Sequence, residues 1–331
     1  MQLIGVVVIG RNEGKRLQQC LLSVIGKETT VVYVDSGSTD TSVALAGLLG
    51  VHVVELDLSI PFTAARARNA GFEYLLQVKP EVGYVQFVDG DCWIVDGWLE
   101  TAARELDTHP EVVVVCGRRR EEFPEHSIYN RLLDIEWNTP VGEAKACGGD
   151  SMIRVTAFKN VGGFNPLLIA GEEPELCVRL RQAGGKIWRL DADMTWHDGQ
   201  MTSFGQWWKR SVRSGHAYAE GAWLHGRSPE HHWVKESVRI WVWSLILPLL
   251  AIATFFSTHA FSILLLLLAY LFSGYRAYKW TQSRGFTQKD AIAYGLFCIL
   301  GKFPQLIGQS QFFLYKLSNR QPTIVEYKGA F

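Results

Sequence analysis

Residues 84–91, Tyr-Val-Gln-Phe-Val-Asp-Gly-Asp, combine a short hydrophobic run with two carboxylates. The run Tyr84–Val88 has the β-branched and aromatic composition of a buried strand. Similar runs precede it, and helix-like stretches separate them. The runs are residues 3–9, 30–34 and 51–56, and the helix-like stretches are residues 14–25, 41–49 and 63–76. This alternation predicts an α/β fold with an open, mostly parallel sheet, in which ligands bind at the carboxyl ends of the strands.

Asp89 and Asp91 follow the predicted strand directly, with Gly90 between them. A divalent ion on a diphosphate needs few hard oxygen ligands from the protein, because Mg²⁺ keeps waters and takes its other ligands from phosphate. Gly90 lets the backbone approach a ligand closely. The same residue types also form plain turns. Taken with Asp35, which also follows a hydrophobic run, we interpret the pair as a metal and donor site.

Asp35 comes directly after the predicted strand 30–34 and before a glycine turn. At the ligand edge of the sheet it would accept a hydrogen bond from a nucleotide base or a ribose hydroxyl. The alternative is ordinary turn chemistry. Asp40 has a structural interpretation as a cap of the helix that is expected from Thr41.

Three acids lie in and just before the first turn of a helix that is expected within residues 171–181, where Pro174 is an acceptable early residue. Acids at this position suit the helix dipole without any catalytic role, and this explanation is sufficient for Glu175. For Glu172 and Glu173 the functional interpretation is a general base that takes a proton from an acceptor hydroxyl.

His197 follows the strand-like run 186–190 and precedes an aromatic and basic stretch, residues 204–210. A single histidine is usually structural or solvated, so its functional interpretation, a third metal contact or a phosphate contact, is one of two alternatives. Trp207 and Arg210 are predicted to face the headgroup or phosphates of an acceptor, and Asp150 is assigned to the same kind of contact. For the tryptophan-rich stretch, an interfacial membrane anchor is the alternative.

Composition excludes several classes of protein. The 331 residues carry no net charge, which gives no reason to expect nucleic acid as a partner. The first predicted strand is followed by Gly10-Arg-Asn-Glu-Gly14, which lacks the G-x-G-x-x-G turn of dinucleotide-binding proteins. Six scattered cysteines without a CxxC pair indicate neither a zinc site nor a disulfide framework.

Hydrophobic segments dominate the sequence beyond about residue 236. Residues 237–256 and 259–275 are nearly free of charge and apolar on all faces, which predicts a transmembrane hairpin rather than two buried core helices. Basic residues on both flanks place those flanks in the cytoplasm. A third apolar stretch, residues 291–317, contains Lys302, Pro304 and three glutamines, so an amphipathic segment in the membrane interface is favoured over a third span.

With these residues in place, the chain resembles the family 2 glycosyltransferases, an inverting class with the GT-A fold. The resemblance covers roughly residues 3–225. The matching motifs are I9-G-R-N-E-G14, V34-D-S-G-S-T-D40, A67-R-N-A-G71, V88-D-G-D91, V161-G-G-F164 and G171-E-E-P-E-L-C-V-R-L-R181. Each motif is short, but their order and spacing together are specific. The C-terminal segments resemble those of membrane-bound members that build polysaccharides or glycolipids.

The resemblance implies a role for each motif. Asp35 would contact the nucleotide, with Glu13 and Arg68 nearby, and Asp91 would bind Mg²⁺ or Mn²⁺ while Asp89 supports the donor. Relatives commonly have Gly-Glu-Asp where this chain has Gly171-Glu-Glu, and Glu173 is chosen over Glu172 as the base. The implied domains are a GT-A domain at 1–225, a connector at 226–236, a transmembrane hairpin at 237–275 and a cytoplasmic or interfacial tail at 276–331.

The implied reaction is displacement at the anomeric carbon of a nucleotide sugar, with inversion, and with a lipid-linked or membrane acceptor. The expected location is the inner (plasma) membrane, with the catalytic domain in the cytoplasm. One alternative is a sugar nucleotidyltransferase, although Arg11 in a G-R-N-E-G turn matches the glycine- and arginine-rich loop of such enzymes poorly. Another is a non-catalytic, membrane-anchored nucleotide-sugar binding protein, which would not require the acidic pair.

Overall fold

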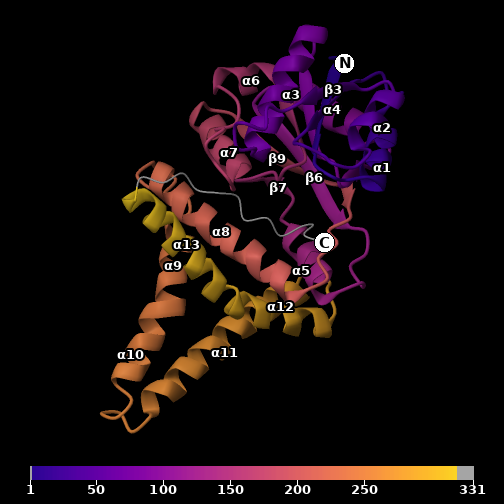
Figure 1. Cartoon of the computed structure of the whole chain (residues 1–331). Helices are drawn as coiled ribbons and strands as arrows, with labels where there is room; N and C mark the ends of the chain where they lie inside the picture. Colours follow the sequence, from indigo (N-terminus) through magenta and orange to yellow (C-terminus); the bar gives the residue numbers. More distant parts are fainter. Residues whose placement is uncertain (1, 319–331) are drawn as a thin grey trace. The chain divides into compact units, whose positions relative to one another are not determined.

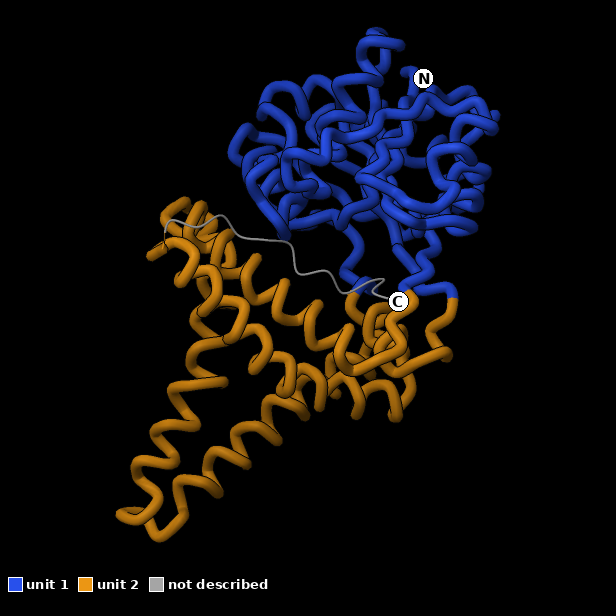
Figure 2. Tube along the Cα trace, in the orientation of Figure 1, with its two compact units in different colours: residues 1–122, 137–199 blue, residues 123–136, 200–331 orange. Residues whose placement is uncertain are grey.

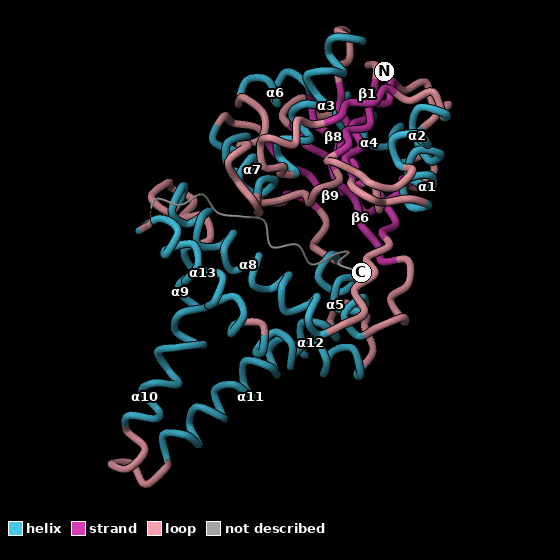
Figure 3. Tube along the Cα trace, viewed as in Figure 1, coloured by secondary structure: helices cyan, strands magenta, loops and turns pink. Residues whose placement is uncertain are grey.

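The computed structural model of this chain describes residues 2–318, which form two units (Figure 2). Unit 1 contains residues 2–122 and 137–199, and unit 2 contains residues 123–136 and 200–318. The strands all belong to unit 1, whereas unit 2 is built from helices (Figure 3).

A nine-stranded sheet organises unit 1. Its order is β3-β2-β1-β4-β8-β6-β9-β5, with β7 added to β9. The first four strands are parallel to one another, β8 runs antiparallel to β4 and β6, and β6 is parallel to β9. The strands are β1 Ile4–Gly10, β2 Thr30–Asp35, β3 His52–Glu55, β4 Tyr84–Asp89, β5 Cys92–Ile94, β6 Val112–Glu121, β7 Gly142–Glu143, β8 Ser151–Arg154 and β9 Lys186–His197.

Helices of unit 1 pack on this sheet (Figure 1). In the first, third and fourth helices, apolar side chains such as Leu17, Leu75 and Leu106 are fully buried. Gly71 lets the third helix lie directly on the sheet, because a Cβ atom there would overlap Val7 and Val34. The helices are α1 Lys15–Val24, α2 Ser42–Leu48, α3 Ala64–Val78, α4 Trp98–Thr108, α6 Val155–Asn160 and α7 Glu172–Gln182.

The predicted α/β fold is confirmed. The four predicted strands and the three predicted helices are present, with ends that differ by at most two residues. The run expected at 186–190 is longer than predicted, since β9 continues to His197, pairs with β6 up to that residue and also pairs with β5 at its end. His197 is therefore part of a strand rather than of the loop after it.

Unit 2 consists of helices that pack partly through glycine. Gly215 and Gly308 bring α8 and α13 into close contact, because a Cβ atom at either position would clash with the backbone of the other helix. The helices are α5 Ile128–Trp137, α8 Phe204–His225, α9 Val234–Trp241, the π-helical turn η1 Val242–Ile246, α10 Leu247–Ala253, α11 Phe261–Gln282, α12 Gln288–Leu300 and α13 Lys302–Leu317.

Three helical segments of unit 2 are long and apolar enough to cross a membrane. They are Val234–Ala253, Phe261–Gln282 and Gln288–Leu317. The first two contain most of the predicted hairpin. The third includes the stretch 291–317, so by length and composition it also qualifies as a span, and its predicted position in the interface stays a prediction. The chain has the membrane-bound type of C-terminal region that the sequence indicates.

Pro248 distorts the first of these segments, as expected for a proline inside a helix. In the π-helical turn that precedes it, Leu247 N–H donates to the carbonyl of Val242, five residues back. The carbonyl of Trp243 would be next in this pattern, but Pro248 has no N–H to donate. The hydroxyl of Tyr270 on α11 donates to that carbonyl instead, at 2.7 Å. This bond ties the two helices together at a backbone group that would otherwise lack a partner.

The units differ from the predicted domains in two places. Unit 1 leaves out residues 123–136 and ends at Gly199, whereas the predicted catalytic domain runs without a break to residue 225. Most of α5 and all of α8 therefore belong to unit 2, where α8 packs on α13 through Gly215 and Gly308. Of the predicted tail 276–331, residues 319–331 lie outside the described residues.

Candidate active site

Asp35 lies at the carboxyl end of β2 and is 2% exposed. Its carboxylate accepts hydrogen bonds from the Tyr33 hydroxyl (2.8 Å) and from the N–H groups of Gly37 (2.9 Å) and Ser38 (2.7 Å). Burial raises the pKa of Tyr33, so its hydroxyl remains a donor. These contacts agree with the interpretation of Asp35 as a turn residue, because they hold the loop after β2 in shape. A contact between Asp35 and a nucleotide stays a prediction.

Asp89, at the end of β4, is held by two arginines. Arg68 Nη2 donates to Oδ1 at 2.7 Å, and Arg119 Nη2 donates to Oδ2 at 2.8 Å. Burial by itself would raise the pKa of Asp89, but the two guanidinium groups outweigh burial and lower this pKa to about 2. Both carboxylate oxygens thus face arginines. Asp89 was predicted both to support the donor and to bind the metal, and both roles stay predictions.

Arg68, on α3, links Asp89 to the start of α7. Its Nη1 donates to Glu172 Oε1 at 2.7 Å, and its guanidinium lies over the Phe164 ring, 5.5 Å from the centroid. The arginine side chain is only 3% exposed. The structure therefore brings together three predicted site residues that are far apart in the sequence.

Asp150 lies behind this cluster rather than at its surface. Its side chain is buried, and its oxygens accept from Asp89 N–H (3.0 Å) and from the Thr195 hydroxyl (2.9 Å). Arg119 Nε is 3.0 Å from Asp150 Oδ2. These contacts orient Asp89 and Arg119, and the predicted contact of Asp150 with the acceptor stays a prediction.

Gly149 allows the backbone to pass close to the cluster. A Cβ atom at this position would lie 2.7 Å from Arg68 Nη2 and 3.0 Å from Asp89 Oδ2. We expect Gly149→Ala to displace this ion pair and to raise KM for the donor about tenfold, while the chain still folds. Steady-state kinetics with a thermal melt measures both effects. The matched control is Gly47→Ala on α2, where a Cβ atom has no neighbour within 4 Å; equal kinetics in the two variants would contradict the steric argument.

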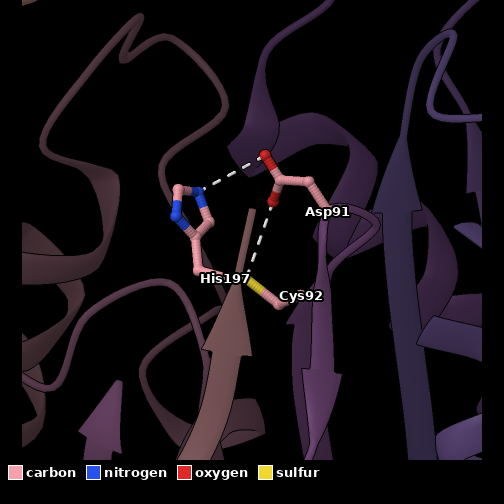
Figure 4. A group of neighbouring side chains, drawn as sticks. All are labelled: Asp91, Cys92 and His197. Atoms are coloured by element: carbon pink, nitrogen blue, oxygen red, sulfur yellow. Dashed lines mark hydrogen bonds and ion pairs between the residues drawn. The ribbon is translucent and has the colours of Figure 1, made fainter. Parts of the chain in front are cut away.

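Asp91 and His197 face one another across β5 and β9 (Figure 4). Asp91 Oδ2 lies 3.5 Å from His197 Nε2, and both side chains are 5% exposed. The other ring nitrogen of His197, Nδ1, is 2.9 Å from Glu121 Oε2. Cys92 Sγ is also close, 3.6 Å from Asp91 Oδ1. Carboxylate, imidazole and thiol therefore meet in one buried group.

This group fits a divalent ion. Two neighbouring ligands of an octahedral ion with bonds of about 2.1 Å lie roughly 3 Å apart, which is close to the observed Asp91–His197 separation. The Glu121 carboxylate on the far nitrogen is the arrangement that commonly fixes a metal-binding histidine. Oxygen and imidazole nitrogen suit Mg²⁺ and Mn²⁺ better than sulfur does, so Asp91 and His197 are the candidate ligands and Cys92 is not.

Glu121 supplies a test of this arrangement. We expect Glu121→Gln to weaken Mn²⁺ binding by about 10- to 100-fold, the usual effect of losing such a partner of a histidine ligand. Titration of the purified full chain with Mn²⁺, followed by electron paramagnetic resonance, measures the affinity. The control is Glu122→Gln, one residue along, whose carboxyl forms no described bond to His197. Unchanged affinity in Glu121→Gln would contradict the assignment of His197.

The side chain of Glu173 points toward the thiols of Cys147 and Cys177. Its Oε1 accepts from the backbone N–H of Cys147 (2.6 Å) and lies 3.0 Å from Cys147 Sγ and 2.9 Å from Cys177 Sγ. The residue is 6% exposed, and burial raises its pKa. Glu172 and Glu173 are neighbours in sequence, yet only Glu172 contacts Arg68.

Glu13 and Gly90 lie next to each other at the first strand's end. A Cβ atom on Gly90 would be 3.1 Å from the carbonyl oxygen of Ile9 and 3.3 Å from Glu13 Cγ. Glu13 Oε2 forms an ion pair with Arg16 at 2.7 Å. A side chain at position 90 would thus be crowded by Ile9 and Glu13, while the approach of Gly90 to a ligand and the nucleotide contact of Glu13 stay predictions.

Trp207 and Arg210 belong to unit 2, unlike the other predicted site residues. Trp207 is 4% exposed and packs edge-on against Phe297, with ring centroids 4.8 Å apart. Arg210 pairs with Glu136 at 2.8 Å. Trp207 therefore has a packing contact within unit 2, and the predicted contacts of Trp207 and Arg210 with an acceptor stay predictions.

The sequence did not lead us to predict four residues of this site: Arg119, Glu121, Cys147 and Gly149. The run Val112–Cys116 followed by Gly-Arg-Arg-Arg-Glu is a hydrophobic strand that ends in charge, which is the signal used for Asp35 and Asp89. Applied there, it would have indicated Arg119 and Glu121. Cys147 carried no such signal, because its partner Glu173 is 26 residues away.

Comparison with known proteins identifies the family and the fold of the chain. Residues 5–160 match the model of glycosyl transferase family 2. The N-terminal part of the chain belongs to this family. Residues 135–203, which overlap the end of that match and continue beyond it, also match a model described as the N-terminal domain of galactosyltransferase.

Two curated proteins are among the relatives of this chain. The pre-mycofactocin glycosyltransferase of Mycobacterium tuberculosis is 26% identical over 235 residues, which is 67% of this chain and 48% of the relative. The succinoglycan biosynthesis protein ExoA of Rhizobium meliloti is 27% identical over 172 residues, 49% of this chain and 51% of the relative. The chain spans about half the length of these curated relatives.

A solved structure shares the fold. It is a mannosyltransferase from Pyrobaculum calidifontis in complex with GDP-Man and Mn²⁺. The TM-score is 0.59 at 17% sequence identity, and the match covers 89% of this chain and 86% of the mannosyltransferase. At this identity the likeness shows the GT-A fold alone.

Proposed function

We propose that this protein transfers a sugar, with inversion, from a nucleoside diphosphate sugar to a membrane or lipid-linked acceptor in polysaccharide or glycolipid synthesis. The family, its glycan-related relatives and the neighbour that binds GDP-Man and Mn²⁺ support sugar transfer. The three apolar helices support a membrane location. We further propose the inner membrane, with the catalytic unit in the cytoplasm.

One observation carries the proposal. Arg68 binds Asp89 and Glu172 at once, so residues from α3, β4 and α7 meet in one buried cluster at the ligand edge of the sheet. Asp91, two residues from Asp89, pairs with His197 beside this cluster. A site that joins arginines, carboxylates and a candidate metal position suits a diphosphate leaving group.

Each residue then has a part in donor binding. Asp91 and His197 would hold Mg²⁺ or Mn²⁺, which when bound neutralises charge on the departing diphosphate and contributes several kcal/mol. Glu121 orients His197 through Nδ1. Asp89, Arg68 and Gly90 would support the sugar and phosphates of the donor, while Asp35 and Glu13 would contact its nucleoside.

Glu173 is the proposed base, and Glu172 is proposed to hold Arg68. Burial raises the pKa of Glu173, which brings the carboxylate closer to a pKa useful for accepting a proton near neutrality. Glu172 is already engaged with Arg68. The acceptor hydroxyl would lose its proton to Glu173 as its oxygen forms the new glycosidic bond and the nucleoside diphosphate leaves.

The test is a screen of nucleotide sugars against membranes that contain the full chain, with and without Mn²⁺. Release of nucleoside diphosphate, which increases with Mn²⁺, is the expected result, and the anomeric configuration of the product reports inversion. Formation of nucleoside triphosphate from pyrophosphate would instead support a sugar nucleotidyltransferase. Donor binding without any turnover would support a non-catalytic binding protein.

A further inference from the structure

Unit 2 contains a cavity of about 510 Å³ among its apolar helices. Figure 1 shows α10 and α11 meeting at the loop 254–260, with α12 and α13 linking their other ends back toward α9. The cavity lies among α9, η1, α11, α12 and the first residue of α13. Its size is in the usual range for a small-molecule site.

Three cations line this cavity: Arg239 from α9, Arg276 from α11 and Lys302 from α13. No carboxylate is among the lining residues, and within residues 2–318 none of the three forms an ion pair with Asp or Glu. Glu236, one turn before Arg239, lies outside the lining. Two other arginines of unit 2 do form ion pairs, Arg131 with Asp290 and Arg210 with Glu136. Three like charges in one cavity repel each other unless an anion joins them.

The position of these cations along the chain puts them at one end of the predicted hairpin. Arg239 directly precedes the apolar residues that begin at Ile240, and Arg276 directly follows the apolar run 261–275. Both therefore mark the end at which the hairpin enters and leaves the hydrocarbon layer. Lipid phosphates lie at this level, and basic pockets between membrane helices bind them.

The remaining walls of the cavity are aromatic and apolar. The rings of Trp243 and Tyr270 lie 5.8 Å apart, and the Tyr270 hydroxyl donates to the Trp243 carbonyl, which fixes the pair. Ile299 and Ala277 add aliphatic surface. A ligand that fits has a concentrated negative charge at one end and a hydrocarbon chain at the other.

We propose that this cavity binds the terminal phosphate or diphosphate of a single-chain membrane lipid. A phosphate monoester carries nearly two negative charges at neutral pH, and a diphosphate carries more, whereas the phosphodiester of an ordinary phospholipid carries one. Three cations match the larger charge. This site goes beyond the proposed sugar transfer and does not depend on it, because the cavity contains none of the proposed catalytic residues.

The experiment uses the full chain in phosphatidylcholine nanodiscs, without donor or metal, and measures binding of a short prenyl phosphate by native mass spectrometry. The variant Arg239→Gln/Arg276→Gln/Lys302→Gln is expected to lose affinity by roughly tenfold for each cation, as for a charged hydrogen bond. Arg276→Gln alone, at an exposed residue, is expected to lose about tenfold and guards against misfolding of the triple variant.

The matched control removes the same charge elsewhere, from three helices that contribute to the cavity lining: α9, α11 and α12. Lys235→Gln/Lys279→Gln/Lys289→Gln changes three exposed lysines that do not line the cavity, and it should bind as the unmodified chain does. The matching prenyl alcohol, inorganic phosphate and phosphatidylglycerol should each bind at least tenfold more weakly. Equal loss in both triple variants would overturn the site. Inorganic phosphate or phosphatidylglycerol binding as tightly as prenyl phosphate would overturn the assignment to a lipid with a terminal phosphate.

Discussion

Asp91→Ala is expected to abolish sugar transfer and the response of the rate to Mn²⁺ at the same time. Asp91 supplies the buried carboxylate that faces His197 at 3.5 Å. Without it the ion loses its only proposed anionic ligand from the chain, and the diphosphate leaves without compensation of its charge. A metal ion contributes several kcal/mol in such sites, which corresponds to roughly a thousandfold or more in rate.

Initial rates over a range of Mn²⁺ concentrations measure this effect. Asp96→Ala is the control, because it removes a carboxylate from the same region whose side chain is 98% exposed. That variant should keep both the rate and its Mn²⁺ response. Activity in Asp91→Ala that no longer needs metal would contradict the ligand role of Asp91.

Glu173→Gln is expected to retain donor binding and to lose transfer. The amide keeps the size of the side chain but cannot accept a proton, so kcat should fall by about 10² to 10⁴. Because burial raises the pKa of Glu173, the unmodified chain should lose activity as the pH falls through a value above about 4.3, the ordinary pKa of a glutamate. Any remaining kcat of the Glu173→Gln variant should therefore not fall over this range of pH.

Glu172→Gln separates the two neighbouring acids. Its carboxylate accepts from Arg68, which also binds Asp89, so its loss should raise KM for the donor more than it lowers kcat. Equilibrium binding of the donor and steady-state kinetics on both variants give this comparison. Full activity in Glu173→Gln, together with a collapsed kcat in Glu172→Gln, would move the base to Glu172.

The fold could be predicted because its signal is local. Each of the strands β1, β2 and β3 is a short apolar run that is followed by a polar turn and a helix. The spacing and the composition of the apolar residues are therefore enough to predict these strands and helices. Strands β2 and β4 deliver Asp35 and Asp89 to one edge of the sheet, as the sequence predicted. The full length of β9 was not predicted, although its second half, residues 191–197, alternates polar and apolar residues, which is the pattern of a half-buried strand. This half pairs with β5 and β6.

The side-chain partners within the site could not be predicted, because they depend on contacts between distant segments. Nothing near Asp89 in sequence indicates that Arg119 and Arg68 occupy both of its oxygens. Likewise, the pocket of Glu173 is made by Cys147 and Cys177, which sequence reasoning described only as scattered cysteines. Residue types and strand ends indicate where a site lies, whereas packing decides which atoms face each other.

The most direct test of the central claim is pulsed electron paramagnetic resonance of Mn²⁺ on the full chain, with the nucleoside diphosphate released in the donor screen. We expect one ion to show coupling to a histidine nitrogen and to phosphorus together, and we expect His197→Gln to remove only the nitrogen signal. Manganese that couples to phosphorus without any nitrogen signal in the unmodified chain would contradict it, because the ion would then lie away from Asp91 and His197.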